Sequence, residues 1–118
     1  VNMAGYVAFN KQQGITKTVS YQHALMLLND PKVVFVDVRS FFEKEAQGSL
    51  PNAMNVDLDQ LPQRYSSIPK DKKIIVFCDN GIRGYNAEQF LRNQGYDVYN
   101  LDGGYYYISN MIKESIHV

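Results

Sequence analysis

Two short, nearly continuous apolar runs constrain the fold of this chain more than any other feature. Residues Val33 to Val38 form the first run, which only Asp37 interrupts, and Ile74 to Phe77 form the second. Continuous rather than alternating hydrophobicity predicts strands that are covered on both faces, as in a parallel sheet. Neither run reaches the roughly 20 apolar residues that a membrane-spanning helix needs. The sequence therefore predicts a buried sheet with helices packed on each side.

Segments with helical spacing alternate with strands along the rest of the chain. We predict strands over residues 16–19, 33–38, 55–56, 74–77 and 97–101, and helices over residues 21–28, 41–47, 58–65, 85–94 and 105–113. Strands that alternate with helices imply right-handed crossovers and parallel pairing. The expected fold class is therefore α/β, with a mainly parallel central sheet of about five strands flanked by helices on both faces.

The composition limits the kinds of partner. The chain has 118 residues, which is an ordinary size for one domain. Its 45% hydrophobic and 20% charged residues exclude wholesale disorder. Twelve Lys and Arg balance twelve Asp and Glu, whereas nucleic-acid binding needs a basic excess or a dense basic patch. We therefore expect no nucleic-acid and no membrane partner, while a small anionic substrate stays compatible with this charge.

A single cysteine, Cys78, is the most informative residue count. One thiol cannot form a disulfide or a zinc site within the chain, so we expect no metal. A lone thiol suits a reducing, cytoplasmic compartment, and the start of the chain lacks the pattern of a signal peptide. The histidines, His23 and His117, fall on the first predicted helix and at the tail, so we expect no Cys–His pair.

Cys78 directly follows the predicted strand 74–77, at the edge where open α/β sheets bind ligands. Backbone N–H groups of the next loop, residues 79–84, can form a concave anion site that stabilises a thiolate. The loop glycines permit the cramped backbone of such a ring, and its arginine brings forked donors for an oxyanion. The predicted site comprises Cys78 as the catalytic nucleophile and Asp79, Asn80, Gly81, Ile82, Arg83 and Gly84 as the anion-binding loop.

Two features bear on this interpretation of the cysteine. The Asp79 carboxylate would oppose a thiolate if it pointed inward, because like charges repel. A buried structural cysteine at the end of a core strand is the alternative. The sequence Gly-Ile-Arg-Gly after Cys78 favours the reactive thiol, since a purely structural strand end needs no arginine between two glycines.

Four blocks of sequence, in order, resemble the rhodanese (sulfurtransferase) family. The stretch 78–83 resembles the active-site pattern Cys-x-x-Gly-x-Arg of that family. Val36-Asp37-Val38-Arg39 with Glu43, Gly48-Ser49-Leu50-Pro51-Asn52-Ala53, and Leu101-Asp102-Gly103-Gly104 resemble three further family blocks. The chain departs from the family pattern at four positions, which are Ser49 for histidine, Asn52 for glycine, Gly84 for a small hydroxyl residue and Ile108 for tryptophan. The resemblance spans about residues 15–118 and implies a rhodanese-like domain over that range.

The resemblance implies a rhodanese-type sulfurtransferase. Cys78 would take sulfane sulfur from thiosulfate, a persulfide or a polysulfide, and pass it from a Cys78 persulfide to a thiol acceptor. Arg83 would bind the anionic donor. From its place at a strand end, Asp37 would cap the turn there or accept hydrogen bonds from the loop, and we favour the structural role. We expect Arg39 to pair with Glu43 in the first place, and to help attract an anion in the second. The spacing Cys-x4-Arg is one residue shorter than the Cys-x5-Arg loop of phosphatases on this fold, which favours sulfur chemistry. A non-catalytic docking domain and a phosphatase or arsenate reductase stay open as alternatives.

The first eight residues resemble the closing segment of flavin-dependent CoA-disulfide reductases. This implies that residues 1–14 are a linker or remnant of a preceding reductase module, and their spacing at Met3, Val7 and Ala8 predicts a helix. FAD and NADH would then belong to a full-length oxidoreductase, and we expect no cofactor in this domain. CoA is one candidate for the thiol acceptor.

Overall fold

The computed structural model describes residues 17–80 and 82–116. The predicted helix within residues 1–14, Gly81 of the predicted loop and His117 lie outside the described residues. No helix in the described ranges is both long and apolar enough to cross a membrane.

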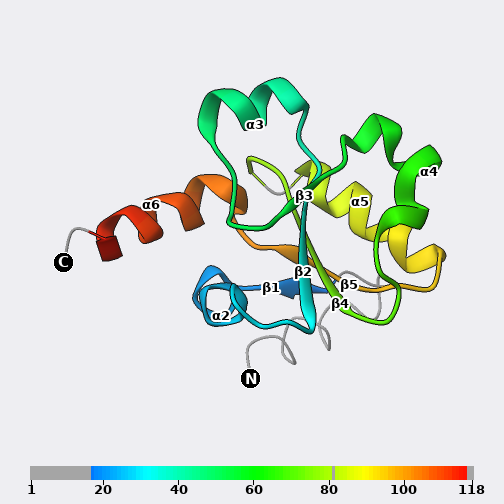
Figure 1. The fold of residues 1–118 in the computed structure, drawn as a ribbon, viewed down its shortest axis with the longest axis horizontal. Helices are drawn as coiled ribbons and strands as arrows, with labels where there is room; N and C mark the ends of the chain where they lie inside the picture. Colours follow the sequence, from blue (N-terminus) through cyan, green and yellow to red (C-terminus); the bar gives the residue numbers. More distant parts are fainter. Residues whose placement is uncertain (1–16, 81, 117–118) are drawn as a thin grey trace.

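Five parallel strands form the sheet at the centre of the domain (Figure 1). They are β1 (Thr18–Val19), β2 (Val33–Asp37), β3 (Met54–Asn55), β4 (Lys73–Phe77) and β5 (Asp97–Leu101), in the order β1-β5-β4-β2-β3. The two apolar runs form β2 and β4, which pair along their full length from Val33 opposite Lys73 to Asp37 opposite Phe77. Strands in the middle of a sheet have no solvated face, which explains their continuous hydrophobicity.

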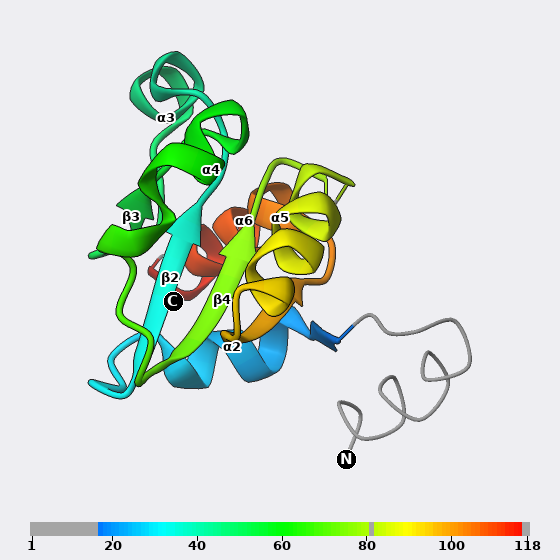
Figure 2. The same cartoon turned by 90° about the vertical axis from the view of Figure 1, so that its right-hand side faces the viewer.

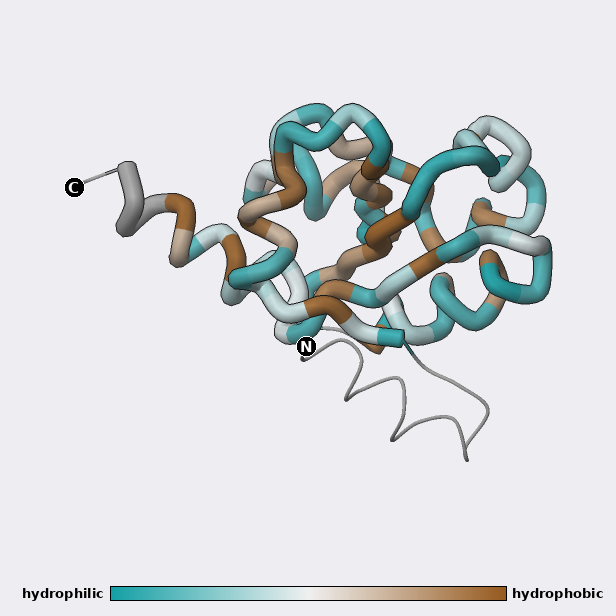
Figure 3. The backbone as a smooth tube through the Cα atoms, turned by 90° about the horizontal axis from the view of Figure 1, so that it is seen from below, coloured by the Kyte–Doolittle hydropathy of each residue, from teal (hydrophilic) through white to brown (hydrophobic). Residues whose placement is uncertain are grey.

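Helices cover both faces of this sheet (Figure 2). The helical elements are α2 (Tyr21–Leu27), α3 (Phe41–Gln47), η2 (Leu58–Gln60), α4 (Leu61–Arg64), η3 (Tyr65–Ser67), α5 (Ile82–Asn93) and α6 (Gly104–Ile116). On one face α4 and α5 bury apolar side chains against Val36 and Val76. On the other face α2 and α6 pack against Phe35 and Ile75. Hydrophobic positions accordingly gather towards the middle of the domain, with hydrophilic segments around it (Figure 3). The predicted fold class is confirmed.

Several predicted boundaries differ from the structure. The helix predicted over 58–65 is split into η2, α4 and η3, and Pro62 lies in the first turn of α4, where a missing N–H is tolerated. The third strand is Met54–Asn55, so Val56 follows the strand and joins the core instead. The predicted loop 79–84 is wrong in its second half because α5 begins at Ile82.

Candidate active site

Cys78 lies at the carboxyl end of β4, fully buried, with a backbone donor from α5 on its sulfur. The Gly84 N–H donates to Sγ at 3.3 Å, and the Asn80 carboxamide oxygen lies 3.8 Å from Sγ, where it accepts the thiol hydrogen. The same Asn80 oxygen accepts the Ile82 N–H at 3.2 Å, which satisfies a donor at the start of the helix. The sulfur therefore meets the N-terminal turn of α5, where backbone N–H groups lack helical partners and carry partial positive charge.

The start of α6 fixes the backbone on the other side of the sulfur. The N–H groups of Tyr105 and Tyr106 donate to the carbonyls of Cys78 and Asp79 at 2.7 and 3.3 Å. Gly104 has a φ of 67°, and a Cβ there would lie 2.6 Å from the Cys78 oxygen and 2.5 Å from the Asp79 oxygen. The glycine at this position is therefore required both by the left-handed backbone and by the close approach.

Arg83 points to α3 and forms a two-point ion pair with Glu43. Nη1 donates to Oε1 at 2.7 Å, and Nη2 donates to Oε2 at 2.9 Å. The hydrogen bond from Arg83, followed by the one from the Ser40 backbone, lowers the pKa of Glu43 to about 2. The Ser40 hydroxyl in turn accepts the Glu43 N–H, so Glu43 also completes the capping box of α3. The predicted Arg39–Glu43 ion pair is wrong, because Glu43 binds Arg83.

Arg39 instead forms a fully buried ion pair with Asp37 at the end of β2. Arg39 Nε and Nη2 donate to the two Asp37 carboxylate oxygens at 2.9 and 2.7 Å. Nη2 also donates to the Gly48 carbonyl at 2.6 Å, and the guanidinium lies 4.4 Å from the centre of the Tyr105 ring. The pair thus joins three parts of the fold beneath the loop that follows Cys78: the end of β2, the segment just after α3, and helix α6. Burial without these partners would leave an uncompensated charge.

The Asp37 carboxylate accepts hydrogen bonds from Arg39 and from the Ser49 hydroxyl, the latter at 2.8 Å. Among the described residues of the loop none donates to Asp37, whose Oδ1 instead accepts the Arg39 N–H at 3.0 Å at the end of the strand. Ser49, a departure from the family pattern, has a structural role in this buried cluster.

The sequence from residue 20 to residue 111 matches the family model described as "Rhodanese-like domain". The chain belongs to the rhodanese-like domain family. Among known proteins, it is 40% identical over 79 residues to a sulfurtransferase of Allochromatium vinosum, covering 66% of this chain and 73% of that protein. It is 40% identical over 85 residues to the tRNA uridine(34) hydroxylase of Erwinia tasmaniensis, covering 66% of this chain but only 24% of that protein.

Solved structures extend this likeness. Reduced Bacillus anthracis CoADR-RHD matches with 34% identity and a TM-score of 0.81, covering 96% of this chain and 20% of that chain. An NAD-dependent persulfide reductase from A. fulgidus matches with 29% identity and a TM-score of 0.66, covering 84% of this chain and 17% of that chain. The predicted resemblance to the rhodanese domain of a CoA-disulfide reductase is confirmed. The rhodanese-like domain spans about a quarter or less of these longer proteins.

The rhodanese-like domain carries a second polar arrangement on α5 that the sequence did not reveal. A Cβ at Gly84 would lie 2.2 Å from Oδ1 of Asn100 on β5, so this side chain occupies the space beside the glycine. One helical turn later, Glu88 is fully buried, accepts the Lys17 N–H at 3.0 Å and forms an ion pair with Arg92. Burial raises the pKa of Glu88 despite these partners. Spacing on α5 could have indicated that Glu88 shares a face with Gly84, but not what that face meets.

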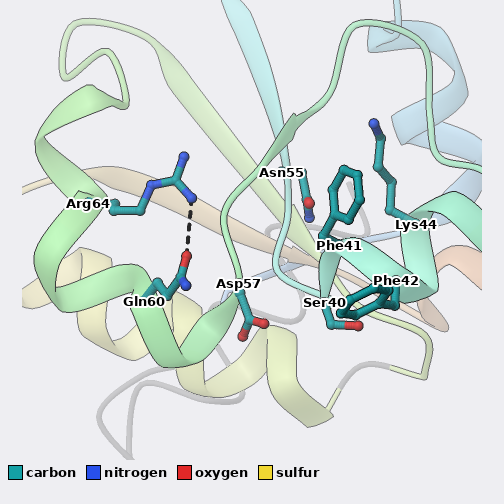
Figure 4. Close-up of a pocket in the computed structure, with 8 residues that line it drawn as sticks. All are labelled: Ser40, Phe41, Phe42, Lys44, Asn55, Asp57, Gln60 and Arg64. Carbon is teal, nitrogen blue, oxygen red and sulfur yellow. Dashed lines mark hydrogen bonds between the residues drawn. The ribbon is translucent and has the colours of Figure 1, made fainter.

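Two cavities of the rhodanese-like domain lie beside the loop rather than over the sulfur. One of about 420 Å³ separates α3 from η2 and α4 (Figure 4). Another of about 370 Å³ is bounded by α3, α6 and Asp79. Cys78 lines neither of these two cavities. His23 is exposed on α2, as predicted, and the described residues include no group of three or more His, Cys, Asp or Glu residues suited to a metal ion.

Proposed function

We propose that this rhodanese-like domain is a sulfurtransferase that carries a sulfane sulfur on Cys78. The observation that carries the proposal is the Gly84 N–H on Sγ at 3.3 Å, at the N-terminal turn of a 12-residue helix. A helix N-terminus offers backbone N–H donors and partial positive charge to an anion bound beside it, such as a sulfane-sulfur donor. Sulfurtransferase relatives support the same reaction class.

In the first step the Cys78 thiolate attacks the outer sulfur of the donor. With thiosulfate, the new bond joins Sγ to that sulfur, the sulfur–sulfur bond of the donor breaks, and sulfite leaves with the bonding pair. The terminal sulfur of the Cys78 persulfide then lies among the N–H groups of the loop. In the second step an acceptor thiolate attacks this terminal sulfur, and Cys78 leaves as a thiolate. The acceptor becomes a persulfide, and neither step needs an external oxidant or reductant.

Arg83 is the expected cation for an anionic donor, but its guanidinium is engaged by Glu43. Donor binding therefore requires Arg83 to exchange a carboxylate for the donor, or to hold both. Because the side chains of Arg83 and Glu43 remain 37% and 31% exposed, their ion pair is accessible to a competing anion.

A wider role is part of the proposal. The likeness to CoADR-RHD and to a persulfide reductase supports a place for this domain in a flavin-dependent CoA-disulfide or persulfide reductase of the cytoplasm. FAD and NADH would bind in the reductase module, and no described residue is assigned to either. The natural donor would be thiosulfate, a persulfide or a polysulfide, and the acceptor a thiol.

Intact-mass spectrometry after exposure to thiosulfate or polysulfide tests this function. We expect a gain of one sulfur on the wild-type chain, its removal by cyanide or by a thiol, and no gain in Cys78→Ser. A folded protein that gains no sulfur from any of these donors would overturn the proposal. The burial of Cys78 would then favour the non-catalytic docking domain as the better account. Hydrolysis of an aryl phosphate that depends on Cys78 would instead favour the phosphatase alternative.

A further inference from the structure

Helix α3 is attached to the domain differently from α2, α4, α5 and α6. Each of those four helices buries at least one side chain in the apolar cores, for example Ala24 of α2 and Ile108 of α6. None of the seven residues of α3 is buried, and none belongs to either core of the described residues. Phe41 and Phe42 are 56% and 81% exposed, and their rings contact each other. The helix lies beyond the carboxyl end of β2 (Figure 2), and apolar packing does not hold it in place.

The carboxyl end of α3 is anchored to the buried Asp37–Arg39 pair. Arg39 Nη1 donates to the side-chain oxygen of Gln47 at 3.2 Å, and Nη2 donates to the Gly48 carbonyl at 2.6 Å. The Tyr105 hydroxyl of α6 donates to the Gln47 carbonyl at 3.3 Å. Because Arg39 is itself fully buried and held by Asp37, this end of α3 is a fixed point.

The amino-terminal half of α3 is attached through the ion pair between Glu43 and Arg83. Its two hydrogen bonds join α3 to the first turn of α5. Lys44 pairs with Glu45 and lies over the ring of Phe41, so its charge is engaged within α3. Across the part of the chain that the structure describes, no other hydrogen bond or ion pair links this half of α3 to another element. The Glu43–Arg83 ion pair is therefore what holds it against α5.

Open space lies on both sides of α3. The cavity of about 420 Å³ separates it from η2 and α4, and the cavity of about 370 Å³ separates it from α6. A helix of seven residues is marginal without packing. Segments with few buried apolar contacts open locally at a small part of the free energy needed to unfold the whole domain. The helix can thus pivot about its carboxyl end without disturbing the core.

The Glu43–Arg83 ion pair can be released by an anion but not by protonation at neutral pH. The hydrogen bond from Arg83, followed by the one from the Ser40 backbone, lowers the pKa of Glu43 to about 2, so Glu43 stays charged. Arg83 is 37% exposed, and its forked donors fit an oxyanion as well as a carboxylate. Asp79 also lies within electrostatic range of Arg83, so the guanidinium keeps a carboxylate nearby when Glu43 leaves. Because Gly84 comes next and donates to the sulfur, an anion on Arg83 would be bound beside the nucleophile.

We propose that α3 is a flap that responds to the donor. It pivots about Gln47 and Gly48 and moves away from α5 when an anionic donor takes the place of Glu43 on Arg83. Glu43 is the positioning residue of this movement, because it acts on the donor only through Arg83. The inference rests on the proposed sulfurtransferase function, which supplies the donor, and adds a conformational step to it. Once sulfite has left, Glu43 returns to Arg83.

Hydrogen exchange followed by mass spectrometry tests the movement, because the exchange rate reports the population of the open state. In Cys78→Ser thiosulfate binds without sulfur transfer, and Cys78→Ala serves if the serine variant does not fold. We expect thiosulfate to speed exchange of the N–H groups of residues 44–48 about threefold or more, as loss of a part-exposed ion pair allows. The comparison is with NaCl of equal ionic strength, which controls for screening. Helix α2 has the same length and buries Ala24, so its exchange should not change.

Two arginine variants in the same background separate this ion pair from a general surface change. Arg83→Gln removes the pair without altering α3 or its capping box. We expect its α3 to exchange about threefold to fivefold faster without any donor, and thiosulfate to have no further effect. Arg64→Gln is the matched control, because it removes an exposed arginine of α4 whose hydrogen bond goes to Gln60 rather than to α3. Its α3 should exchange at the rate of the parent protein, with and without thiosulfate.

Unchanged exchange of α3 in Arg83→Gln would overturn the inference. A merely structural ion pair would give faster exchange in Arg83→Gln but no response to thiosulfate, and that result would overturn the inference as well. In both cases the wild type would still form the Cys78 persulfide, so the sulfurtransferase function would stand. If no persulfide forms with any donor, the function fails and the donor-driven movement fails with it, and intact-mass spectrometry of the wild type distinguishes this outcome from failure of the flap alone.

Discussion

Glu43 and Arg83 are 40 residues apart in sequence and meet through two charge-assisted hydrogen bonds of 2.7 and 2.9 Å. The pair joins α3 to the first turn of α5, which donates to the sulfur of Cys78. It also occupies the guanidinium that would bind an anionic donor. Under the proposed function, an anionic donor would compete with the Glu43 carboxylate for Arg83 or share it, so the strength of this ion pair should affect the affinity for the donor.

Glu43→Gln should increase the affinity for anionic donors. Gln keeps the side-chain oxygen that accepts the Ser40 N–H, but it lacks the charge that holds Arg83. We expect the KM for thiosulfate to fall about threefold to tenfold, as a contribution of about 1 kcal/mol from a half-exposed pair would give. Steady-state kinetics with cyanide as acceptor measure the change. An unchanged or higher KM would mean that Arg83 does not bind the donor.

The same pair makes stability depend on pH in a defined window. The Glu43 pKa of about 2 lies below the ordinary value of 4.5, so the contribution is complete above about 4.5 and is lost as the pH falls towards 2. Solvent screening keeps the contribution below about 1 kcal/mol. Urea unfolding of wild type and Glu43→Gln at several pH values measures it as a difference. A difference that stays constant from neutral pH to about 2 would contradict this account.

Gly104→Ala should destabilise the domain strongly and disorder the loop that follows Cys78. Its Cβ would lie 2.5–2.6 Å from two backbone oxygens, which cannot move as a flexible side chain can. We expect a loss of about 3 kcal/mol or more in the free energy of unfolding. Gly95→Ala is the matched control, because its φ of 93° carries similar strain but its Cβ would meet only the flexible end of Lys70. Its loss should be about 1 kcal/mol. Urea unfolding compares the two, and equal losses would rule out the backbone clash.

Gly84→Ser would restore the hydroxyl residue usual in the family, but Asn100 occupies its space. The new Cβ would lie 2.2 Å from Oδ1 of Asn100 on β5. We expect Gly84→Ser to lower the free energy of unfolding by about 1–3 kcal/mol, as overpacking does. In a double-mutant cycle with Asn100→Ala, the serine should cost at least about 1 kcal/mol less. Additive losses would show that some other contact excludes the serine.

Glu88 should tolerate loss of its charge better than loss of its oxygen atoms. Burial is the largest influence on its pKa, and the carboxylate accepts the Lys17 N–H. Glu88→Gln keeps an acceptor for that N–H and removes the buried charge, so we expect a change within about 1 kcal/mol at neutral pH. Glu88→Ala leaves the donor without its partner and should cost about 2–3 kcal/mol. Thermal or urea unfolding of both variants checks the ranking, and a reversed order would contradict it.

Short-range patterns in the sequence were sufficient for the elements and their order. Continuous apolar runs predicted β2 and β4. In the structure α2 and α3 begin after Ser20 and Ser40, whose side chains accept first-turn N–H groups. Gly95 and Gly103 fell at left-handed positions, as glycines between elements often do. The start of α5 at Ile82 was missed because two glycines within residues 79–84 resembled a loop.

Contacts between distant segments decided the arrangement of the site. The sequence by itself determined a parallel α/β sheet, a cysteine at the end of a central strand and an arginine five residues later. Only the tertiary structure decided that Arg39 binds Asp37 and Arg83 binds Glu43, since two arginines and two carboxylates permit either pairing. It also decided that Gly104 lies against the Cys78 carbonyl. Local sequence patterns indicate which residues are buried and which backbone conformations they prefer. The distances within the folded sheet determine which charged side chains pair.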